Sequence, residues 1–221
     1  MNPGKRLTAV AEFLDSDKKT VDVGTDHAYL PAFLVLSGKV KQVLACDIGR
    51  EPLENARRTV EKYGLQASVA LRISDGLAAV TSDEAEQISI CGMGGTLMAS
   101  ILKSCTWLCR EGLRLVLQPQ SHAWEVRQFL CENGFGILQE CALVDMGKLY
   151  ITIAAVYDGK TRAVHPGYYW FGELAAAGSD AAVLYVEQQK KQLLTRADCL
   201  HRAGTGEEEE AYLRECLRYI E

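Results

Sequence analysis

The hydrophobic positions of this chain follow two periods from the N-terminus to about residue 157. Short apolar runs predict buried strands, and between them apolar residues recur at helical spacing. We expect strands over residues 20–23, 42–46, 68–73, 87–91, 113–117, 137–144 and 149–156, and helices over 28–36, 51–63, 96–104 and 123–133, after a helical period from residue 7 to 14. Strands that alternate with helices predict an α/β fold, a parallel sheet covered on both faces.

The last two predicted strands must run antiparallel. Only the short turn from Asp145 to Lys148 joins them, whereas a parallel crossover needs a dozen or more residues. A parallel sheet that ends in an antiparallel hairpin is typical of class I, Rossmann-like methyltransferases. Nicotinamide-binding domains usually lack that ending. We therefore predict a methyltransferase sheet over residues 1–158, as a domain that binds S-adenosylmethionine.

After Tyr157 the pattern changes. The segment DGKTRAVHPG predicts a linker, and residues 168–177 predict a short helix. Apolar positions then alternate steps of three and four at Val183, Val186, Lys190, Leu193, Ala197 and Leu200, which is coiled-coil spacing with one polar interruption. The GTG segment at 204–206 ends this helix, and acidic residues from Glu207 open another. Residues 159–221 are expected to form a helical, antiparallel coiled-coil hairpin, which serves RNA binding or, alternatively, stability or dimer formation.

Composition narrows the class of protein. The chain has 221 residues, of which 48% are hydrophobic, so one full domain and a smaller unit can form. The net charge is -5, so RNA binding requires a local basic patch. Candidates for that patch are Lys5, Arg6, Lys160, Arg162, Lys190, Lys191 and Arg196. An acidic enzyme that acts on small molecules remains the alternative.

The eight cysteines form no CxxC pair, and most lie in apolar runs. They are interpreted as small buried residues of a reducing compartment, and no metal site is expected. The N-terminus lacks an apolar leader, and no apolar run approaches the roughly 18 residues of a membrane span. We expect a cytoplasmic protein without membrane contact, in the form of a monomer.

The segment VDVGTDHAYLP at residues 21–31 joins the first strand to the next helix. Gly24 lets the backbone approach a ligand, but only one glycine is present, so the three-glycine fingerprint for a dinucleotide pyrophosphate fails. S-adenosylmethionine carries no phosphate and tolerates side chains in this turn. Its cationic end can be received by Asp26.

Acidic residues end the second and third predicted strands. Asp47 lies within reach of a ribose bound over Gly24, in the way an acid contacts the ribose in dinucleotide folds. Asp75 occupies the matching position for an adenine. Their neighbours Ile48 and Gly76 complete this part of the cofactor set. Two alternatives stay open, an N-cap role for Asp47 and a simple turn built by Ser74.

The segment CGMGGTL follows the fourth strand, at the edge that faces the reacting centre in methyltransferases. Gly92 and Gly94 permit close backbone approach to a flat ligand, and Met93 offers a polarizable face. The fifth strand ends in Gln118, Pro119 and Gln120, whose amides can reach the same cleft. A helix-entry turn is the structural alternative for both segments.

These motifs together resemble the bacterial tRNA adenine N1-methyltransferase family, which modifies the adenine at position 22 of tRNA. The segments that carry the resemblance, over nearly the whole chain, are VDVGTDHAYLP, ACDI, PLENA, SDGLAAV, ICGMGGTL, LVLQPQ and AWEVRQFL. The resemblance implies S-adenosyl-L-methionine as donor and ring nitrogen 1 of an adenine in tRNA as acceptor. It places Gly24, Asp26, Asp47, Asp75 and Gly92 on the family's cofactor motifs, while residues 48–52 depart from the family pattern.

The expected reaction needs alignment more than a base, because the lone pair on adenine nitrogen 1 is free. The target must leave its stack, since its pairing edge reacts. Asp26 and His27 are the expected catalytic residues, Asp26 accepting from the exocyclic amine and His27 stacking or relaying a proton. Packing roles are the alternatives for His27 and Tyr29. The tRNA-contacting candidates are Arg6, Tyr29, Gly94, Gln118, Pro119, Lys190 and Lys191. A small-molecule methyltransferase and a non-catalytic cofactor-binding protein remain alternative functions.

Overall fold

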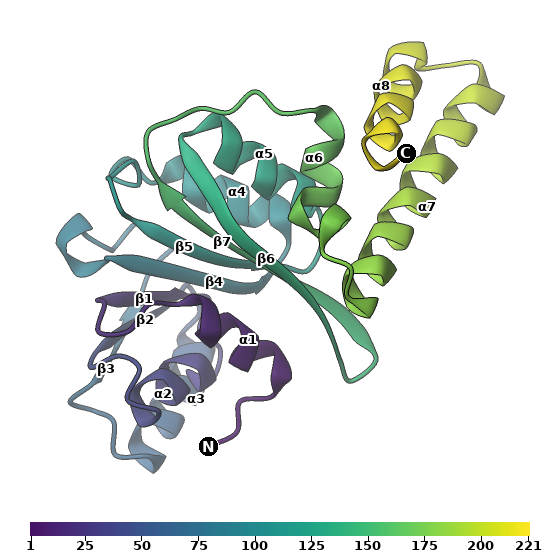
Figure 1. Cartoon of the computed structure of the whole chain (residues 1–221). Coiled ribbons are helices and arrows are strands. Elements are labelled where there is room, and N and C mark those ends of the chain that lie inside the picture. Colours follow the sequence, from purple (N-terminus) through teal and green to yellow (C-terminus); the bar gives the residue numbers. More distant parts are fainter.

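The computed structural model describes all 221 residues, and its centre is one seven-stranded sheet (Figure 1). The strand order is β3-β2-β1-β4-β5-β7-β6. The strands are β1 (Thr20–Val23), β2 (Val43–Asp47), β3 (Val69–Ile73), β4 (Gln87–Met93), β5 (Arg114–Pro119), β6 (Phe135–Asp145) and β7 (Lys148–Tyr157). β1 to β5 pair in parallel, and β7 pairs antiparallel with both β5 and β6. The predicted methyltransferase sheet with its terminal hairpin is confirmed.

Helices cover both faces of this sheet. They are α1 (Lys5–Phe13), α2 (Tyr29–Leu36), α3 (Arg50–Lys62), α4 (Gly95–Ser104), α5 (Ala123–Glu132), α6 (Pro166–Phe171), α7 (Asp180–Ala203) and α8 (Glu207–Leu217), with single 3-10 turns at Ser82–Glu84, Gly172–Ala176 and Arg218–Ile220. Apolar residues of α1, α2 and α3 pack on one face, and those of α4 and α5 pack on the other. Because both faces are covered there, the strands at the centre of the sheet are almost completely buried, whereas the edge strands β3 and β6 are only partly buried.

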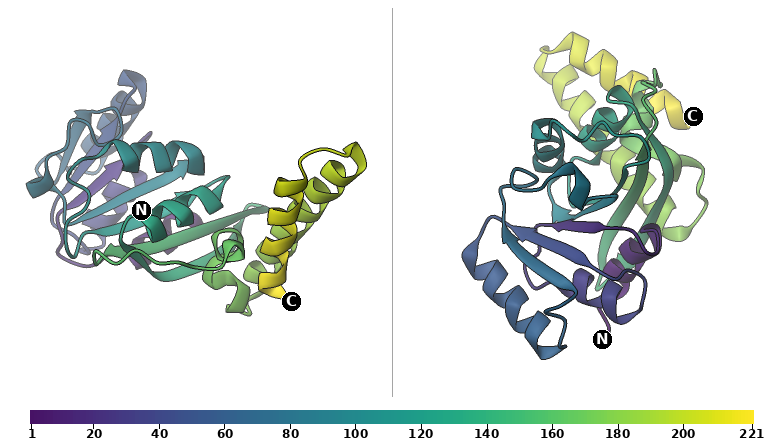
Figure 2. Two further views of the ribbon diagram at one scale, coloured as in Figure 1. Left: turned by 90° about the horizontal axis from the view of Figure 1, so that it is seen from above. Right: turned by 90° about the vertical axis from the view of Figure 1, so that its left-hand side faces the viewer.

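The end of the chain forms the predicted helical hairpin, which projects beyond the sheet (Figures 1 and 2). Leu193 and Ala197 of α7 are buried against Leu213 and Leu217 of α8, together with Trp170 of α6. The predicted apolar stripe is wrong at its first position, because Val183 is 53% exposed. The first turns of α7 pack on the seven-stranded sheet instead, through Ala182 and Tyr185. A coiled-coil geometry for the hairpin stays a prediction.

A fully buried ion pair holds this joint between the sheet and the hairpin. Arg127 of α5 donates from Nε to Glu140 of β6 over 2.7 Å, and neither side chain has any exposed area. The same guanidinium donates to the backbone carbonyls of Tyr169 and Trp170 and to the Tyr185 hydroxyl. These bonds satisfy a buried cation that would otherwise be costly. One arginine thus ties the last helices to the sheet.

Candidate active site

A cavity of about 340 Å³ opens at the carboxyl edge of the sheet, where β1 and β4 end. Ligands of open parallel sheets bind at this edge. Six predicted site residues line the cavity, namely Arg6, Gly24, Asp26, His27, Tyr29 and Gly92, together with Asp22 and Gln120. The structure therefore brings the GTDHAYLP turn, the GMGG turn and the first helix together around one space, which we call the catalytic cleft.

Gly24 forms the turn that follows β1, with φ +81°. The N–H groups of Gly24 and Thr25 both donate to the carbonyl of Cys46, over 2.8 and 3.0 Å, so the turn is tied to β2. A Cβ on Gly24 would lie 2.1 Å from Cε of Met93. The backbone conformation therefore favours glycine here, and the terminal methyl group of Met93 occupies the space that a Cβ would need.

Asp22 is a site residue that the sequence analysis missed. It lies in the middle of β1, is buried, lines the catalytic cleft and accepts hydrogen bonds from the hydroxyls of Thr25 and Ser89, both over 2.7 Å. Burial raises the pKa of its carboxyl to about 6, although both hydroxyls and Arg6 act in the opposite direction. The signal was a lone acid in the apolar strand TVDV.

Asp26, His27 and Tyr29 form a cluster on the wall of the cleft. Nε2 of His27 lies 3.4 Å from Oδ2 of Asp26, and both side chains are open to solvent. The His27 ring stacks on Tyr29 with centroids 5.1 Å apart and planes inclined by 12°. Tyr29 is 46% exposed, so the core-packing alternative for this residue is wrong. Ala28 stands between these two residues in the sequence, adopts φ +51° and turns the chain into α2.

Asp47 and Ile48 lie at the end of β2, next to the cleft and outside its lining. Oδ1 of Asp47 accepts the N–H of Gly49 over 2.8 Å, and its other oxygen has no hydrogen bond. The N-cap of α3 is Gly49, so the N-cap alternative for Asp47 is wrong. Ile48 is 67% exposed beside this carboxylate. An open carboxylate and a bare apolar side chain suit a ribose and a flat ring.

Asp75 and Gly76 follow β3 and differ in role. The Ser74 hydroxyl donates to the carbonyl of Gly76 over 2.8 Å, so Ser74 builds the turn, as its alternative proposed. Asp75 remains exposed and available to a ligand. A Cβ on Gly76 would lie 2.7 Å from the side chain of Ile101. Gly76 is therefore required for packing against α4.

The three glycines at the end of β4 also differ in role, since one faces the cleft and two are needed for packing. Gly92 has φ +79°, and a Cβ there would stand 3.6 Å from the nearest atoms, so it faces the open cleft. A Cβ on Gly95 would lie 2.2 Å from the carbonyl of His122, and the Gly95 N–H donates to Ser121 over 2.8 Å. A Cβ on Gly94 would lie 3.2 Å from the Ser121 hydroxyl. Gly94 and Gly95 thus fit the helix-entry alternative.

Arg6 reaches the cleft from α1. Its guanidinium donates to Oε1 of Gln118 over 2.6 Å and lies 5.7 Å from the centre of the Tyr150 ring. Gln118 is fully buried, does not line the cleft, and leaves its Nε2 without a partner. The prediction that Gln118 contacts tRNA directly is therefore wrong, because its amide positions Arg6. Pro119 is buried too, and lines a second cavity described below.

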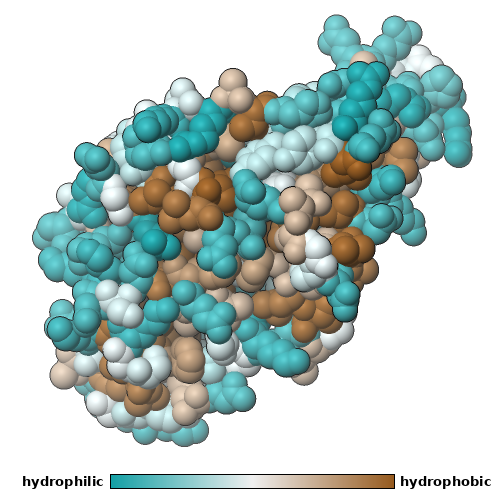
Figure 3. Space-filling view, in the orientation of Figure 1, coloured by the Kyte–Doolittle hydropathy of each residue, from teal (hydrophilic) through white to brown (hydrophobic).

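The remaining basic candidates differ in whether they form an ion pair with an acidic side chain. Arg162 is paired with Asp158, and Arg196 is paired with Glu209. Lys5, Lys160, Lys190 and Lys191 have no ion pair, and the last two lie exposed on α7. Figure 3 shows that hydrophilic residues cover the outer end of the hairpin, at the upper right. Free cations therefore remain on the helical hairpin as well as near the cleft.

Three further features bear on ligands. No group of three or more His, Cys, Asp or Glu side chains is placed to hold a metal ion. No helix combines the length and the apolar character that crossing a bilayer requires. All eight cysteines are free, and Cys109 and Cys199 are exposed, against the expectation of general burial.

Comparison with known proteins agrees with this geometry. A family model described as a methyltransferase domain matches residues 4–153. The tRNA (adenine(22)-N(1))-methyltransferase of Bacillus subtilis is 38% identical over 162 residues, which cover 70% of this chain and 68% of that protein. The crystal structure of the B. subtilis m1A22 tRNA methyltransferase TrmK superposes with a TM-score of 0.86 at 30% identity, over 98% of this chain and 95% of that chain.

A second solved structure carries a ligand. The Streptococcus pneumoniae protein Sp1610, in complex with S-adenosyl-L-methionine, superposes with a TM-score of 0.82 at 30% identity, covering 96% of this chain and 98% of that chain. The predicted family and donor class are confirmed by these matches, which favour a tRNA-modifying enzyme over the small-molecule alternative. The chain belongs to the methyltransferase domain family and, within it, to the tRNA (adenine(22)-N(1))-methyltransferase family.

Proposed function

We propose that the catalytic cleft transfers a methyl group from S-adenosyl-L-methionine to ring nitrogen 1 of an adenine in tRNA, with position 22 as its target. The observation that carries this proposal is the cluster of Asp26, His27 and Tyr29, which faces Gly92 across the cleft at the carboxyl edge of the sheet. An acid and a stacked aromatic pair suit a flat base that gains positive charge.

The residues present fit the cofactor. Gly24 gives close backbone approach at the cleft, and the half-free carboxylate of Asp47 lies on the neighbouring strand beside the exposed side chain of Ile48. We propose that Gly24, Asp22 and Gly92 hold the amino-acid end, and that Asp47, Ile48 and Asp75 hold the adenosine. Met93, which lies across Gly24, borders both parts. When bound, the cofactor supplies an electrophilic methyl group on a sulfonium.

The protein's task is to hold the target adenine in line with that methyl group. Nitrogen 1 uses its own lone pair to form the new N–C bond while the C–S bond breaks, and the base becomes a cation. The Asp26 carboxylate accepts a hydrogen bond from the exocyclic amine and stabilises this charge. The amine then loses a proton, which His27, 3.4 Å from Asp26, passes toward solvent. Tyr29 holds the His27 ring in place by stacking.

Arg6 completes the cleft on the side of α1. Its guanidinium is held by Gln118 and Tyr150, so its position is set before any ligand arrives. A fixed cation at the rim suits a phosphate of the RNA backbone. We propose that Arg6 contacts the tRNA next to the target base, and that Gln118 acts through it.

The proposed function gives each region of the chain a role. We propose that residues 1–158 bind the cofactor and that residues 159–221 bind tRNA, with Lys190 and Lys191 as phosphate contacts. The first turns of α7 and the Gly172–Ala176 turn pack on the catalytic core, so the two parts act as one body. A tRNA substrate is consistent with a cytoplasmic enzyme that works as a monomer.

The test separates chemistry from binding. Asp26→Ala and Asp26→Asn should lower kcat on tRNA by about 10²- to 10⁴-fold, because charge stabilisation at the base is lost. The dissociation constant of the cofactor, measured by calorimetry, should change by less than about threefold if Asp26 acts at the base alone, whereas a larger rise would also assign Asp26 to the cationic end of the cofactor. Methyl transfer to bulk tRNA, followed by alkaline rearrangement to N6-methyladenosine, identifies the product. Unchanged kcat in both variants would remove Asp26 from the mechanism.

A further inference from the structure

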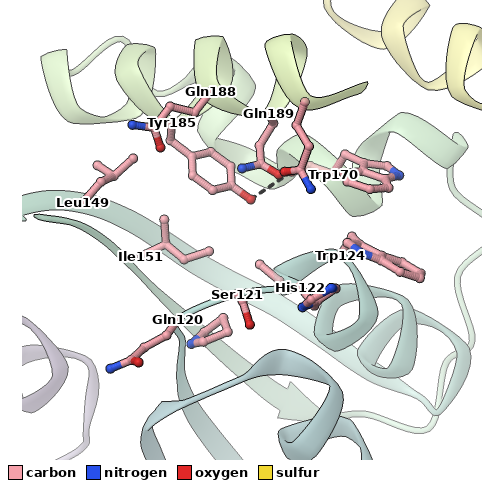
Figure 4. A pocket seen from close by; sticks show the side chains of 13 residues that line it. Gln120, Ser121, His122, Trp124, Leu149, Ile151, Trp170, Tyr185, Gln188 and Gln189 are labelled. Atoms are coloured by element: carbon pink, nitrogen blue, oxygen red, sulfur yellow. Dashed lines mark hydrogen bonds between the residues drawn. The ribbon is translucent and has the colours of Figure 1, made fainter. Parts of the chain in front are cut away.

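A second cavity, of about 260 Å³, lies where α7 meets the catalytic sheet (Figure 4). We call it the joint cavity. Its lining comes from the segment after β5, from β7, and from α5, α6 and α7. Gln120 lines both this cavity and the catalytic cleft, so the two spaces are neighbours at one edge of the sheet.

The joint cavity contains no Asp, Glu, Lys or Arg, in a chain that carries 53 such residues as 24 basic and 29 acidic ones. Four of its polar side chains are amides, and Ser121 and His122 add a hydroxyl and an imidazole. Gln188 and Gln189 of α7 lie on one side of the cavity and Gln120 lies on the other (Figure 4), and Gln192 of α7 also lines it. None of these four side chains has a hydrogen bond within the protein. Each amide offers both a donor and an acceptor, so the lining suits a neutral ligand that presents both kinds of group.

Three aromatic side chains, Trp124, Trp170 and Tyr185, form another part of the lining. Trp124 stacks on Trp170 with centroids 5.4 Å apart and planes inclined by 14°. The Tyr185 hydroxyl donates to the carbonyl of Trp170 over 2.9 Å and accepts from Arg127 over 3.0 Å. These side chains are therefore fixed before a ligand enters. Flat, preorganised walls favour a flat ligand.

We propose that the joint cavity binds an unpaired nucleobase of the tRNA, from a nucleotide adjacent to the target adenine. This inference rests on the proposed function. When the target adenine leaves its stack, the neighbouring base loses a stacking partner. Proteins hold such single-stranded bases on aromatic side chains and by polar groups that contact the base edges. Lys190 and Lys191 interrupt the three glutamines in the sequence and are exposed without ion pairs, so phosphates of the same strand can follow outside the cavity.

The first test replaces the amides without changing their bulk. Gln189→Leu combined with Gln192→Leu should raise KM for tRNA about tenfold or more, because the base loses its edge contacts. We expect kcat at saturating tRNA within about twofold of the parent value, with the cofactor dissociation constant and Tm unchanged. Gln128→Leu, on α5 and outside the cavity, is the matched control. An unchanged KM in the double variant would overturn the proposal.

The second test is a cycle between protein and RNA. In tRNA transcripts, the base on each side of the target is removed in turn to leave an abasic site. The parent enzyme should lose about tenfold in kcat/KM on one of these transcripts, and the double variant should not distinguish that transcript from intact tRNA. If the loss from the double substitution and the loss from the abasic site simply multiplied in kcat/KM, the two sites would be independent and the proposal would be overturned. Filter binding of the same RNAs repeats the cycle without turnover, so an inactive parent enzyme would count against the proposed function alone.

Discussion

The two neighbouring cavities differ in how the chain builds them. The catalytic cleft is lined by α1, by β1 and the turn into α2, by the end of β4 and by Gln120 after β5. The joint cavity is lined by residues 119–124 and by side chains of β7, α6 and α7, which lie farther along the chain. Sheet topology gathers the first set, because the carboxyl ends of parallel strands meet at one edge. Only tertiary packing gathers the second set, and it depends on one buried ion pair.

The largest effect should come from that ion pair. Arg127→Met leaves Glu140 buried without a cation, and should lower the free energy of unfolding by about 3–5 kcal/mol. Urea unfolding measures the loss. Arg162→Met removes a pair whose side chains are one-third exposed, and should cost less than about 1 kcal/mol. If the two losses were equal, the joint would not depend on Arg127.

The catalytic cleft also has a buried ionisable group, Asp22. Unlike the Arg127–Glu140 pair, its charged form lowers the free energy of unfolding at neutral pH. The pKa of Asp22 is about 6 in the folded protein against 3.8 for an unperturbed aspartate. Between these values the folded state binds more protons, so this group's contribution to the free energy of unfolding falls by about 3 kcal/mol as the pH rises from about 4 to about 7.

Asp22→Asn removes this titration. Relative to the parent, the variant should gain stability as the pH rises, and urea unfolding at about pH 4.5 and pH 7.5 measures the difference. Asp75→Asn, at an exposed turn on the same edge, is the control and should show no such gain. A pH profile of the Asp22 variant parallel to that of the parent would contradict the burial argument.

A smaller effect distinguishes two glycines with positive φ. Gly24→Ala places a Cβ 2.1 Å from Met93, whereas Gly38→Ala, at φ +72°, meets nothing within 4 Å. Both substitutions strain the backbone, and the first should cost up to about 1 kcal/mol more, because the flexible end of the Met93 side chain must move aside. It should also weaken cofactor binding, which calorimetry can measure. Equal stability losses in the two variants would show that Met93 yields freely.

The smallest effect is expected on α7. Lys190→Ala with Lys191→Ala should weaken tRNA binding only several-fold, and should reduce the slope of log affinity against log salt by about 1 to 2. Filter binding from low to high salt measures the slope, and Arg196→Ala, whose cation is already paired with Glu209, serves as control. A slope unchanged by the double substitution would exclude phosphate contacts at these lysines.

The fold and most of the catalytic cleft were predictable from the sequence. Most strands are separate apolar runs, GTDHAYLP begins directly after β1, and GMGG lies at the end of β4. The roles of individual glycines were not predictable, because Gly76 and Gly95 are required by contacts with Ile101 and with the His122 carbonyl, far away in the sequence. The same holds for Gln118, whose burial under Arg6 depends on where α1 packs.

The helical hairpin shows the limit of periodicity. Spacing alone placed Val183 in the apolar stripe, but α7 changes partners along its length, from the sheet near Tyr185 to α8 near Leu193. A helix that packs on two different surfaces has two stripes, rotated relative to each other, and no single period describes both. The joint cavity lies at this change of partner and carries no motif.

The stacked pair of Trp124 and Trp170 also gives the protein an optical reporter. The chain has three tryptophans, and the third, Trp107, follows α4 and donates its indole N–H to the carbonyl of Val80. Two of the three chromophores therefore lie at the joint, and both line the joint cavity. Near-ultraviolet circular dichroism and intrinsic fluorescence should be dominated by this pair, so occupancy of the joint can be followed without labels and without catalysis.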